Sequence, residues 1–401
     1  MRKSLCLAIA LSFALTAAAQ TVEPGKKIRV SPTGVAGLPA PVYVPEGGQP
    51  DKPIKLVSED GGIDVPVTNT ERGSVFILPE GLATETVLTI QWADETETPR
   101  VNIVPKEGSD ELDVLINDEL FTTYHYSKEN KKPFLWPMLA EGGVHVTRDY
   151  PMGEAEHHAD HPHHKSYWSA HGEVNGADCW GEGENSGFQV VEEVTWDSGD
   201  AVGWIRSQNV WQNKDHNPVL NETREYRFFA TPSGARLFDT IVTFTAAHGD
   251  VLFGDTKEGG IAALRIRDAI NEEHGGTITL ATGEIGESEA WGKPSPWCDY
   301  SGALLGYGVR GMTIFDHPGN LRHPTNWHVR AYGLMGANPF GYSYFYKGQD
   351  KNGDFTLKNG ESQTFRYRTL VHSGDVEEAN VAGHWKNFVS NPSVGWANTP
   401  N

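Results

Sequence analysis

Short runs that alternate between apolar and polar residues follow one another along most of this 401-residue chain. Such alternation places successive side chains on opposite faces of a β-strand. It recurs at 112–116, 222–229 and 237–244, and Asn359-Gly360 between two later runs is a hairpin signal. Because strands follow strands without intervening helices, the sequence predicts an all-β fold whose main part is a large antiparallel sandwich.

The first part of the chain predicts a small separate β-domain. Short strand-like runs at 27–30 and 86–92 are separated by Gly/Pro turns, and the region contains no histidine. The acidic run at 93–99 contains proline and can bury little surface, which is typical of a linker. We therefore expect an Ig-like β-domain at 20–104, a large β-domain at 105–391 and a tail at 392–401.

One helix is expected, close to the end of the chain. Apolar residues between Val376 and Ser390 recur on roughly one face of a helix, and Asp375 precedes them as a candidate N-cap. Such a helix would cover an edge or a face of a sheet.

Residues 1–19 have the pattern of a secretory signal. Arg2 and Lys3 precede an apolar run, and a small-residue cleavage site ends at Ala19. No later run approaches the roughly 18 apolar residues that a membrane span needs, so we expect a periplasmic or extracellular protein. The formal net charge of −20 becomes two charges more negative without the signal, which argues against nucleic acid and anionic membranes as partners.

Two cysteines, Cys179 and Cys298, follow the signal, and each lies beside a tryptophan. An oxidising compartment would allow a disulfide between them. Two buried free thiols fit the sequence equally well.

Residues 156–180 combine histidine, aromatic and acidic residues. A surface loop does not need this combination, and a core tolerates the polar members only when they have hydrogen-bond partners. The stretch holds six of the sixteen histidines, interleaved with aromatic and acidic residues. Three interpretations stay open: one wall of a catalytic or sugar-binding pocket, a divalent metal site, or a hydrogen-bonded structural network. A metal would be bound by His161 and His163, with His171 or Glu173 as the third ligand.

A second candidate block lies at 254–260, directly after an apolar strand-like run. Glu258 follows Lys257 there, and a carboxylate beside a lysine is a candidate general base. The alternative is a charged turn.

A third block, at 315–341, is rich in histidine, arginine and asparagine. The alternation at 327–330 places His328 and Arg330 on one face, where imidazole can transfer protons and guanidinium can bind a carboxylate or hydroxyls. The alternative is that these side chains join two long loops.

A fourth block contains Trp297, Asp299 and Tyr300. Aromatic rings beside a carboxylate suit a sugar, because ring C–H faces stack on indole while carboxylates accept hydrogen bonds from hydroxyls. Tryptophan is also an ordinary core residue of a sandwich.

Together these blocks resemble an exported bacterial family of unknown function, the PmoA-like family labelled methane oxygenase. The resemblance covers roughly residues 105–390 and is carried by 157–180, 255–260, 297–302, 316–341 and 365–375. It implies a β-supersandwich similar to galactose-mutarotase and carbohydrate-lyase folds, in bacteria that degrade polysaccharides. The oxygenase in the label is a polytopic membrane protein, whereas no membrane span is predicted here. Cys179 and Cys298 depart from the family pattern, which argues against thiol chemistry.

We therefore predict a carbohydrate-active enzyme that catalyses hydrolysis, elimination or epimerisation at a sugar carbon by acid–base chemistry. No cofactor is required by this prediction. The alternatives are a histidine-ligated metalloenzyme, oxidative or not, and a non-catalytic glycan-binding protein. The groups expected to exchange protons are His328, Glu258, His164 and His171. The residues expected to orient the sugar or stack on it are Glu173, Asp178, Trp180, Trp297, Asp299, Tyr300, Arg322, Arg330 and Asn338.

Overall fold

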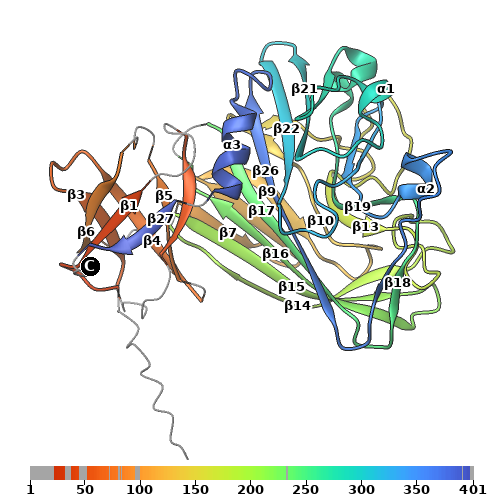
Figure 1. Ribbon diagram of the computed structural model, residues 1–401, viewed down its shortest axis with the longest axis horizontal. Coiled ribbons are helices and arrows are strands. Elements are labelled where there is room, and N and C mark those ends of the chain that lie inside the picture. The colour runs from red at the N-terminus through yellow and green to blue at the C-terminus, as the bar shows by residue number, and fades with distance from the viewer. Residues whose placement is uncertain are drawn as a thin grey trace, which may run out of the picture.

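A computed structural model gives the structure of the protein, which is built mostly from β-strands and confirms the predicted all-β fold (Figure 1). It describes residues 22–31, 38–44, 52–71, 73–79, 82, 84–94, 100–231, 234–390 and 392–397. The predicted signal at 1–19, most of the predicted linker and the last residues of the predicted tail lie outside the described residues.

The N-terminal domain is one seven-stranded sheet that curls almost into a barrel around its own apolar core. Its strand order is β2-β5-β4-β3-β6-β1-β27. Alternate residues such as Ile28, Val30, Leu88 and Ile90 point inward and fill the core. The strands are β1 (Lys27–Ser31), β2 (Ala40–Val44), β3 (Ile54–Ser58), β4 (Asp64–Thr70), β5 (Gly73–Leu78), β6 (Thr86–Trp92) and β27 (Ser393–Trp396).

The end of the chain returns to this domain. β27 pairs antiparallel with β1, so the segment expected to be a tail supplies a strand of the N-terminal sheet (Figure 1). β7 begins at Val101 and pairs with β8 in the large domain, so the two domains meet a few residues earlier than the predicted boundary.

The large domain packs two eight-stranded antiparallel sheets against each other. Sheet I has the order β23-β24-β19-β13-β10-β9-β8-β7, and sheet II has the order β14-β15-β16-β17-β26-β22-β21-β20. The strands of sheet I are β7 (Val101–Pro105), β8 (Glu111–Ile116), β9 (Glu119–His125), β10 (Phe134–Leu135), β13 (Tyr167–His171), β19 (Gly259–Arg265), β23 (Trp327–Val329) and β24 (Leu334–Ala337). Those of sheet II are β14 (Phe188–Asp197), β15 (Val202–Gln212), β16 (Pro218–Phe229), β17 (Arg236–Thr245), β20 (Thr277–Leu280), β21 (Trp297–Leu304), β22 (Gly308–Asp316) and β26 (Ser362–Ser373).

Short elements complete the large domain. Among the described residues, two small two-stranded sheets, β11–β12 and β18–β25, lie outside the main sheets, and the helical segments are single turns apart from the last one. They are β11 (Leu139–Ala140), β12 (Val144–His145), β18 (Val251–Phe253), β25 (Phe355–Leu357), η1 (Asp268–Ile270), η2 (Glu272–His274), α1 (Glu287–Ala290), α2 (Tyr342–Phe345) and α3 (Val381–Val389).

The predicted C-terminal helix is present but shorter than expected. α3 begins at Val381 because Asn380 caps it, accepting a hydrogen bond from the Gly383 amide, while residues 376–380 form turns. Asp375 accepts hydrogen bonds within those turns, not at the helix start. The apolar side of α3 packs on the outer face of sheet II, against residues such as Phe315.

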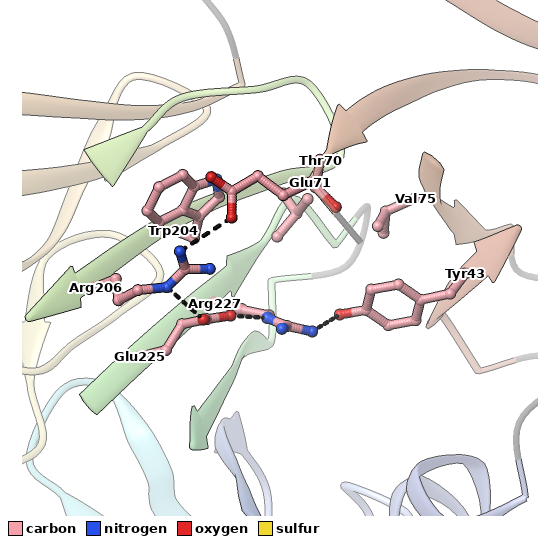
Figure 2. Close-up of a pocket in the computed structure, with 9 residues that line it drawn as sticks. Tyr43, Thr70, Glu71, Val75, Trp204, Arg206, Glu225 and Arg227 are labelled. Atoms are coloured by element: carbon pink, nitrogen blue, oxygen red, sulfur yellow. Dashed lines mark hydrogen bonds and ion pairs between the residues drawn. The ribbon is translucent and has the colours of Figure 1, made fainter. Parts of the chain in front are cut away.

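The two domains share a packed and ion-paired junction. Val75 and Ile77 of β5 join an apolar cluster with large-domain residues. Beside it, the Arg227 guanidinium donates to the Tyr43 hydroxyl at 2.8 Å and contacts Glu225 (Figure 2). Arg206 bridges Glu225 and Glu71, each at 3.0 Å. These charges balance one another, so we interpret the small cleft that they line as a structural contact between the two domains.

Replacing Tyr43 by phenylalanine should lower the free energy of unfolding by about 1–2 kcal/mol, since it removes a hydrogen bond to a charged group at the junction. Denaturant unfolding followed by circular dichroism measures the loss. Tyr307→Phe, at an exposed position, is the matched control and should change stability by less than about 0.5 kcal/mol. Equal effects of the two substitutions would contradict a structural role for the junction contact.

Candidate functional site

A cross-strand row on the outer face of sheet I links two of the predicted blocks. Trp168 on β13 pairs with Ala263 on β19. Ala263 pairs with Gly336 on β24, and Gly336 pairs with His328 on β23. Directly opposed residues of an antiparallel pair point to the same face, and this face is turned away from the core between the sheets. The first and third blocks therefore meet on one surface.

Histidine and aromatic rings stack on this row. The His164 ring lies nearly parallel to Trp168, with ring centroids 5.4 Å apart, and edge-on to Trp180 at 5.6 Å. Trp180 in turn lies 6.2 Å from the His328 ring. We call this set the His–aromatic cluster, and its members are His161, His163, His164, Trp168, Trp180, His328 and Tyr332.

Small residues under the cluster let its rings lie close to the sheet. A Cβ atom at Gly260 would lie 2.7 Å from the Cβ of Ala263 and 3.5 Å from the Trp180 ring. Only glycine fits that position without displacing a neighbour. Gly260, the last residue of the second block, therefore allows close packing beneath Trp180.

Two arginines fix the loop that carries the first histidines. Arg148 donates to the Asp160 carboxylate at 2.5 Å and to the backbone carbonyls of Asp160 and His161. Arg265 donates to the same carboxylate at 3.1 Å and lies 3.3 Å from Nδ1 of His164. Because guanidinium is always a donor, Nδ1 of His164 is the acceptor and the ring is neutral.

Trp180 is held by a loop with its own hydrogen bonds. Asp178 accepts from the amides of Trp180 and Gly181 and from the Ser186 hydroxyl. The Trp180 carbonyl accepts from the buried Lys132 ammonium at 2.9 Å. Asp178, expected to contact a sugar, thus has its carboxylate occupied by its own loop.

Burial keeps three imidazoles of the cluster, those of His163, His164 and His328, neutral. It lowers the pKa of His163 to about 4, with the Lys132 charge adding to the effect. It also holds the pKa of His164 well below its usual range, helped by His163 and Arg265. The pKa of His328 is held well below its usual range by burial, then by the charges of Arg330 and Lys257. At neutral pH each of these rings can accept a proton.

His328 is buried, and within the described residues neither of its ring nitrogens makes a hydrogen bond of good geometry, although the Lys257 carbonyl faces the ring. The indole N–H of the neighbouring Trp180 has no hydrogen-bond partner there. Buried polar groups are nearly always paired in native proteins. Similar unpaired atoms occur in the core, for example at Thr122 and Tyr367, so the position of these two groups beside the charged Lys257–Glu258 pair is what makes the site a candidate.

Three charged residues border the cluster at the surface. Lys257 and Glu258 contact each other and are 33% and 40% exposed. A Cβ at Gly172 would lie 3.0 Å from the Cβ of Glu258 and 3.5 Å from that of Trp180, which places Glu258 beside Trp180. Arg330 pairs with Glu287 at 2.8 Å. The second predicted block therefore joins the first and third.

His171 and Glu173 do not join the cluster. His171 points into the interior, where Nε2 contacts the Gly254 carbonyl at 2.9 Å and the ring packs against Phe253 and Phe340. Burial lowers its pKa to about 4. Glu173 is exposed beside Gly254. His171 is outside the cluster because side chains alternate along β13, so His171 and Trp168 point to opposite faces of sheet I.

The residues of the fourth block lie on sheet II, away from the cluster. Trp297 is 8% exposed and packs under α3, which leaves no free face for a sugar. Tyr300 faces the core, and its hydroxyl donates to the carbonyl of Ala331 at 2.7 Å. Asp299 is buried and accepts from Thr313 at 2.6 Å and from His372 at 2.8 Å.

The stability given by the Asp299–His372 pair should depend on pH. Burial opposes the charged form of His372, but the Asp299 carboxylate and the hydrogen bonds to the ring raise its pKa above 6.5. A raised pKa means that the stabilisation is present below pH 6.5 and is lost as pH rises through the pKa of the folded protein. His372→Gln should therefore lower the free energy of unfolding by about 3 kcal/mol at pH 6 and by less at pH 9, in denaturant titrations at both values. A loss that grows with pH would contradict this sign, and His248→Gln, an exposed histidine, should show no such trend.

Arg322 and Asn338 join loops, as in the alternative interpretation of the third block. Arg322 donates to the carbonyls of Pro339, Gly353 and Asp354. Asn338 donates to the carbonyls of Thr256 and Lys257. These hydrogen bonds occupy the polar groups of both side chains. Asn338 thereby holds the segment before Glu258 in place, and Arg322 joins the loops at 339 and 353–354.

Metal and thiol chemistry find no support in the described part of the chain. No group of three or more His, Cys, Asp or Glu residues there is arranged to hold a metal ion. His161 instead stacks on Tyr332 and contacts Asp160 at 3.1 Å. Cys179 and Cys298 are both free and buried, and burial raises the pKa of the Cys179 thiol to about 12.

No helix among the described residues is long and apolar enough to cross a membrane.

Several residues of the site were not expected from the sequence. Tyr332 stacks on His161, and the Arg265 guanidinium lies over the Tyr332 ring at 4.5 Å. Tyr332 lies within the third block, four residues after His328, so its place in that block was a usable signal. Arg265 ends an apolar strand with no polar pattern around it, and nothing in the sequence pointed to it.

Comparisons with known proteins give a family and no established activity. The family described as "Family of unknown function (DUF6807)" matches residues 111–386. A search of curated proteins finds no match. Among solved structures, a protein in glycosyl hydrolase family 38 from Enterococcus faecalis is 9% identical, with a TM-score of 0.41 over 94% of this chain and 48% of that one. An alpha-mannosidase from Enterococcus faecalis V583 is 10% identical, with a TM-score of 0.42 over 96% of this chain and 48% of that one. This chain thus spans about half the length of both.

Proposed function

The chain belongs to that family of unknown function, DUF6807, and we propose that it is an exported carbohydrate-active protein that binds a sugar at the His–aromatic cluster and acts on it by acid–base chemistry. The observation that carries the proposal is the environment of His328. This ring is neutral and buried, it makes no hydrogen bond of good geometry, and it lies beside Trp180 and close to the Lys257–Glu258 pair. A neutral imidazole and a carboxylate are the groups that general acid–base catalysis uses.

The surface above His328 suits a sugar. Tyr332 and His163 are partly exposed and offer ring faces on which sugar C–H groups can stack. Glu258 and Arg330 stand at the border and can hydrogen-bond hydroxyls. Stacking rings and charged hydrogen-bonding groups side by side are the two kinds of contact that a sugar needs.

Access to His328 requires Trp180 to move. Both nitrogens of His328 are closed to solvent, and the Trp180 indole covers the ring. The indole N–H has no partner, so ring packing alone holds the indole in place. We propose that ligand binding displaces the Trp180 side chain and lets His328 act together with Glu258.

Incubation of the purified protein with a panel of glycans, read by mass spectrometry, tests the proposal. Products whose masses sum to the substrate plus one water identify a hydrolase. Products formed without added water, one of them unsaturated, identify a lyase. An unchanged mass with altered stereochemistry by NMR identifies an epimerase. No binding to any glycan and no change in any of them would refute the proposal.

Non-catalytic glycan binding is a second candidate, favoured by the closed position of His328. It predicts saturable binding with no change of mass and no change of anomeric composition. The same panel, with affinity measured by calorimetry alongside product formation, separates the two functions.

A further inference from the structure

Two cations lie near the His328 ring, and each is paired with a carboxylate. The charges of Arg330 and Lys257 act on the ring, while Lys257 contacts Glu258 and Arg330 contacts Glu287. Arg330 follows His328 by two residues. The Lys257 carbonyl faces the His328 ring and is bound by Asn338, which lies two residues from Gly336, the strand partner of His328. Both cations therefore belong to segments next to an imidazole that makes no hydrogen bond of good geometry.

The present partners of these two cations are replaceable. Lys257 pairs with Glu258, and Arg330 pairs with Glu287, but all four side chains are between 23% and 40% exposed. Ion pairs exposed to water contribute little, typically less than about 1 kcal/mol. A ligand that brings a negative group can therefore compete for both cations.

Three other buried groups without a partner in and beside the cluster are donors. The indole N–H groups of Trp168 and Trp180 and the Nε–H of Arg265 are buried without a partner. A neutral His328 adds one further donor. A ligand that complements this set needs several acceptor oxygens close together, as an acidic group provides.

We infer that the ligand is an acidic sugar whose anionic oxygens bind between Lys257 and Arg330 and accept a hydrogen bond from His328. The inference rests on the proposed function and specifies its substrate class. A uronate carboxylate and a sulfate ester share this chemistry. The net charge of −20 does not oppose it at close range, because charges more than about 8 Å away are screened at physiological salt.

The test compares acidic polymers with neutral copies of themselves. Polygalacturonate and alginate are each paired with the same polymer after chemical reduction of its carboxylates, and carrageenan is paired with its desulfated form. Affinity is measured by isothermal titration calorimetry. At least one acidic polymer should bind at least about tenfold more tightly than its neutral copy, as expected for a hydrogen bond between charged groups. The pair that shows the difference identifies carboxylate or sulfate.

Two variants locate the acidic group. Lys257→Gln and Arg330→Gln should each weaken binding of the acidic polymer by about tenfold. Lys257→Gln should leave the neutral copy unaffected, whereas Arg330→Gln, which removes a group that also binds hydroxyls, should weaken binding of the neutral copy by less than it weakens binding of the acidic polymer. Lys358→Gln and Arg29→Gln remove cations from exposed ion pairs elsewhere and should change neither. Equal binding of acidic and neutral copies, or no loss in either Lys257 or Arg330 variant, overturns the inference.

Failure of the inference can be told from failure of the proposed function. If neutral glycans bind and His328→Asn abolishes that binding or its product, the function stands and the acidic ligand is wrong. If no acidic and no neutral polymer binds, both are wrong.

Discussion

Replacing His328 by asparagine should lower turnover of the glycan identified by the panel by about 10²–10⁴-fold, the usual contribution of a general acid or base. Asparagine keeps the polar character of the position but can neither accept nor release a proton near neutral pH. Glu258→Gln should have an effect of the same order, because it removes the carboxylate and little volume. Initial rates with the purified variants, each checked for folding by circular dichroism, measure both effects.

His248→Asn and Asp250→Asn are the matched controls, since both residues are exposed and far along the chain from the cluster. Their rates should stay within about twofold of the unchanged protein, as expected for surface positions. If His328→Asn and Glu258→Gln keep full activity, the acid–base assignment is wrong even where the sugar binds.

Removal of one partner from the Glu222–Arg224 pair should cost about 3–5 kcal/mol of unfolding free energy. Both side chains are almost fully buried in the core between the two sheets. Glu222 contacts Arg224 at 2.6 Å and also accepts from the Trp211 indole at 2.6 Å. Arg224 further donates to Gln189 at 2.8 Å. In Glu222→Ala the guanidinium loses its carboxylate and stays buried, which is the reason for the large effect.

Denaturant unfolding of Glu222→Ala measures this loss. Asp250→Ala, which breaks an exposed pair with Lys358, is the control and should cost less than about 1 kcal/mol. The double variant Glu222→Met, Arg224→Met should be less destabilised than Glu222→Ala, because hydrophobic residues of similar size can replace a buried ion pair. A loss below about 1 kcal/mol for Glu222→Ala would contradict the structural role given to the pair.

Alternation along the sequence was enough to predict the strand-rich fold but not which face of each strand is buried. In β16 the polar residues Glu222 and Arg224 alternate with Thr223 and Glu225, so the run reads as a strand with a solvent face. The structure instead buries the Glu222–Arg224 side in the core, where the pair satisfies itself. The alternation shows that the two faces of a strand differ, but it does not show which of the two faces is buried in the core.

The same limit applies to the candidate site. The blocks with His164, Glu258 and His328 meet around Trp180, and their forming a functional site stays a prediction. Trp297 and Asp299 belong to sheet II, and their residue types alone resembled the others. Which sheet a strand joins depends on long-range pairing, which local sequence does not encode.

The return of β27 to the N-terminal sheet was also beyond prediction. Its four residues, Ser393–Trp396, alternate too briefly to distinguish a strand from a tail. Pairing with β1 gives the segment its conformation.

The most direct test of the account is a titration of the ¹⁵N-histidine-labelled protein with the glycan identified by the panel, followed by NMR of the imidazole rings. If the His–aromatic cluster is the binding site, the signals of His163, His164 and His328 shift with saturation at the measured affinity, while those of His248 and His372 stay unchanged. Shifts confined to histidines outside the cluster, with glycan bound, would contradict the account.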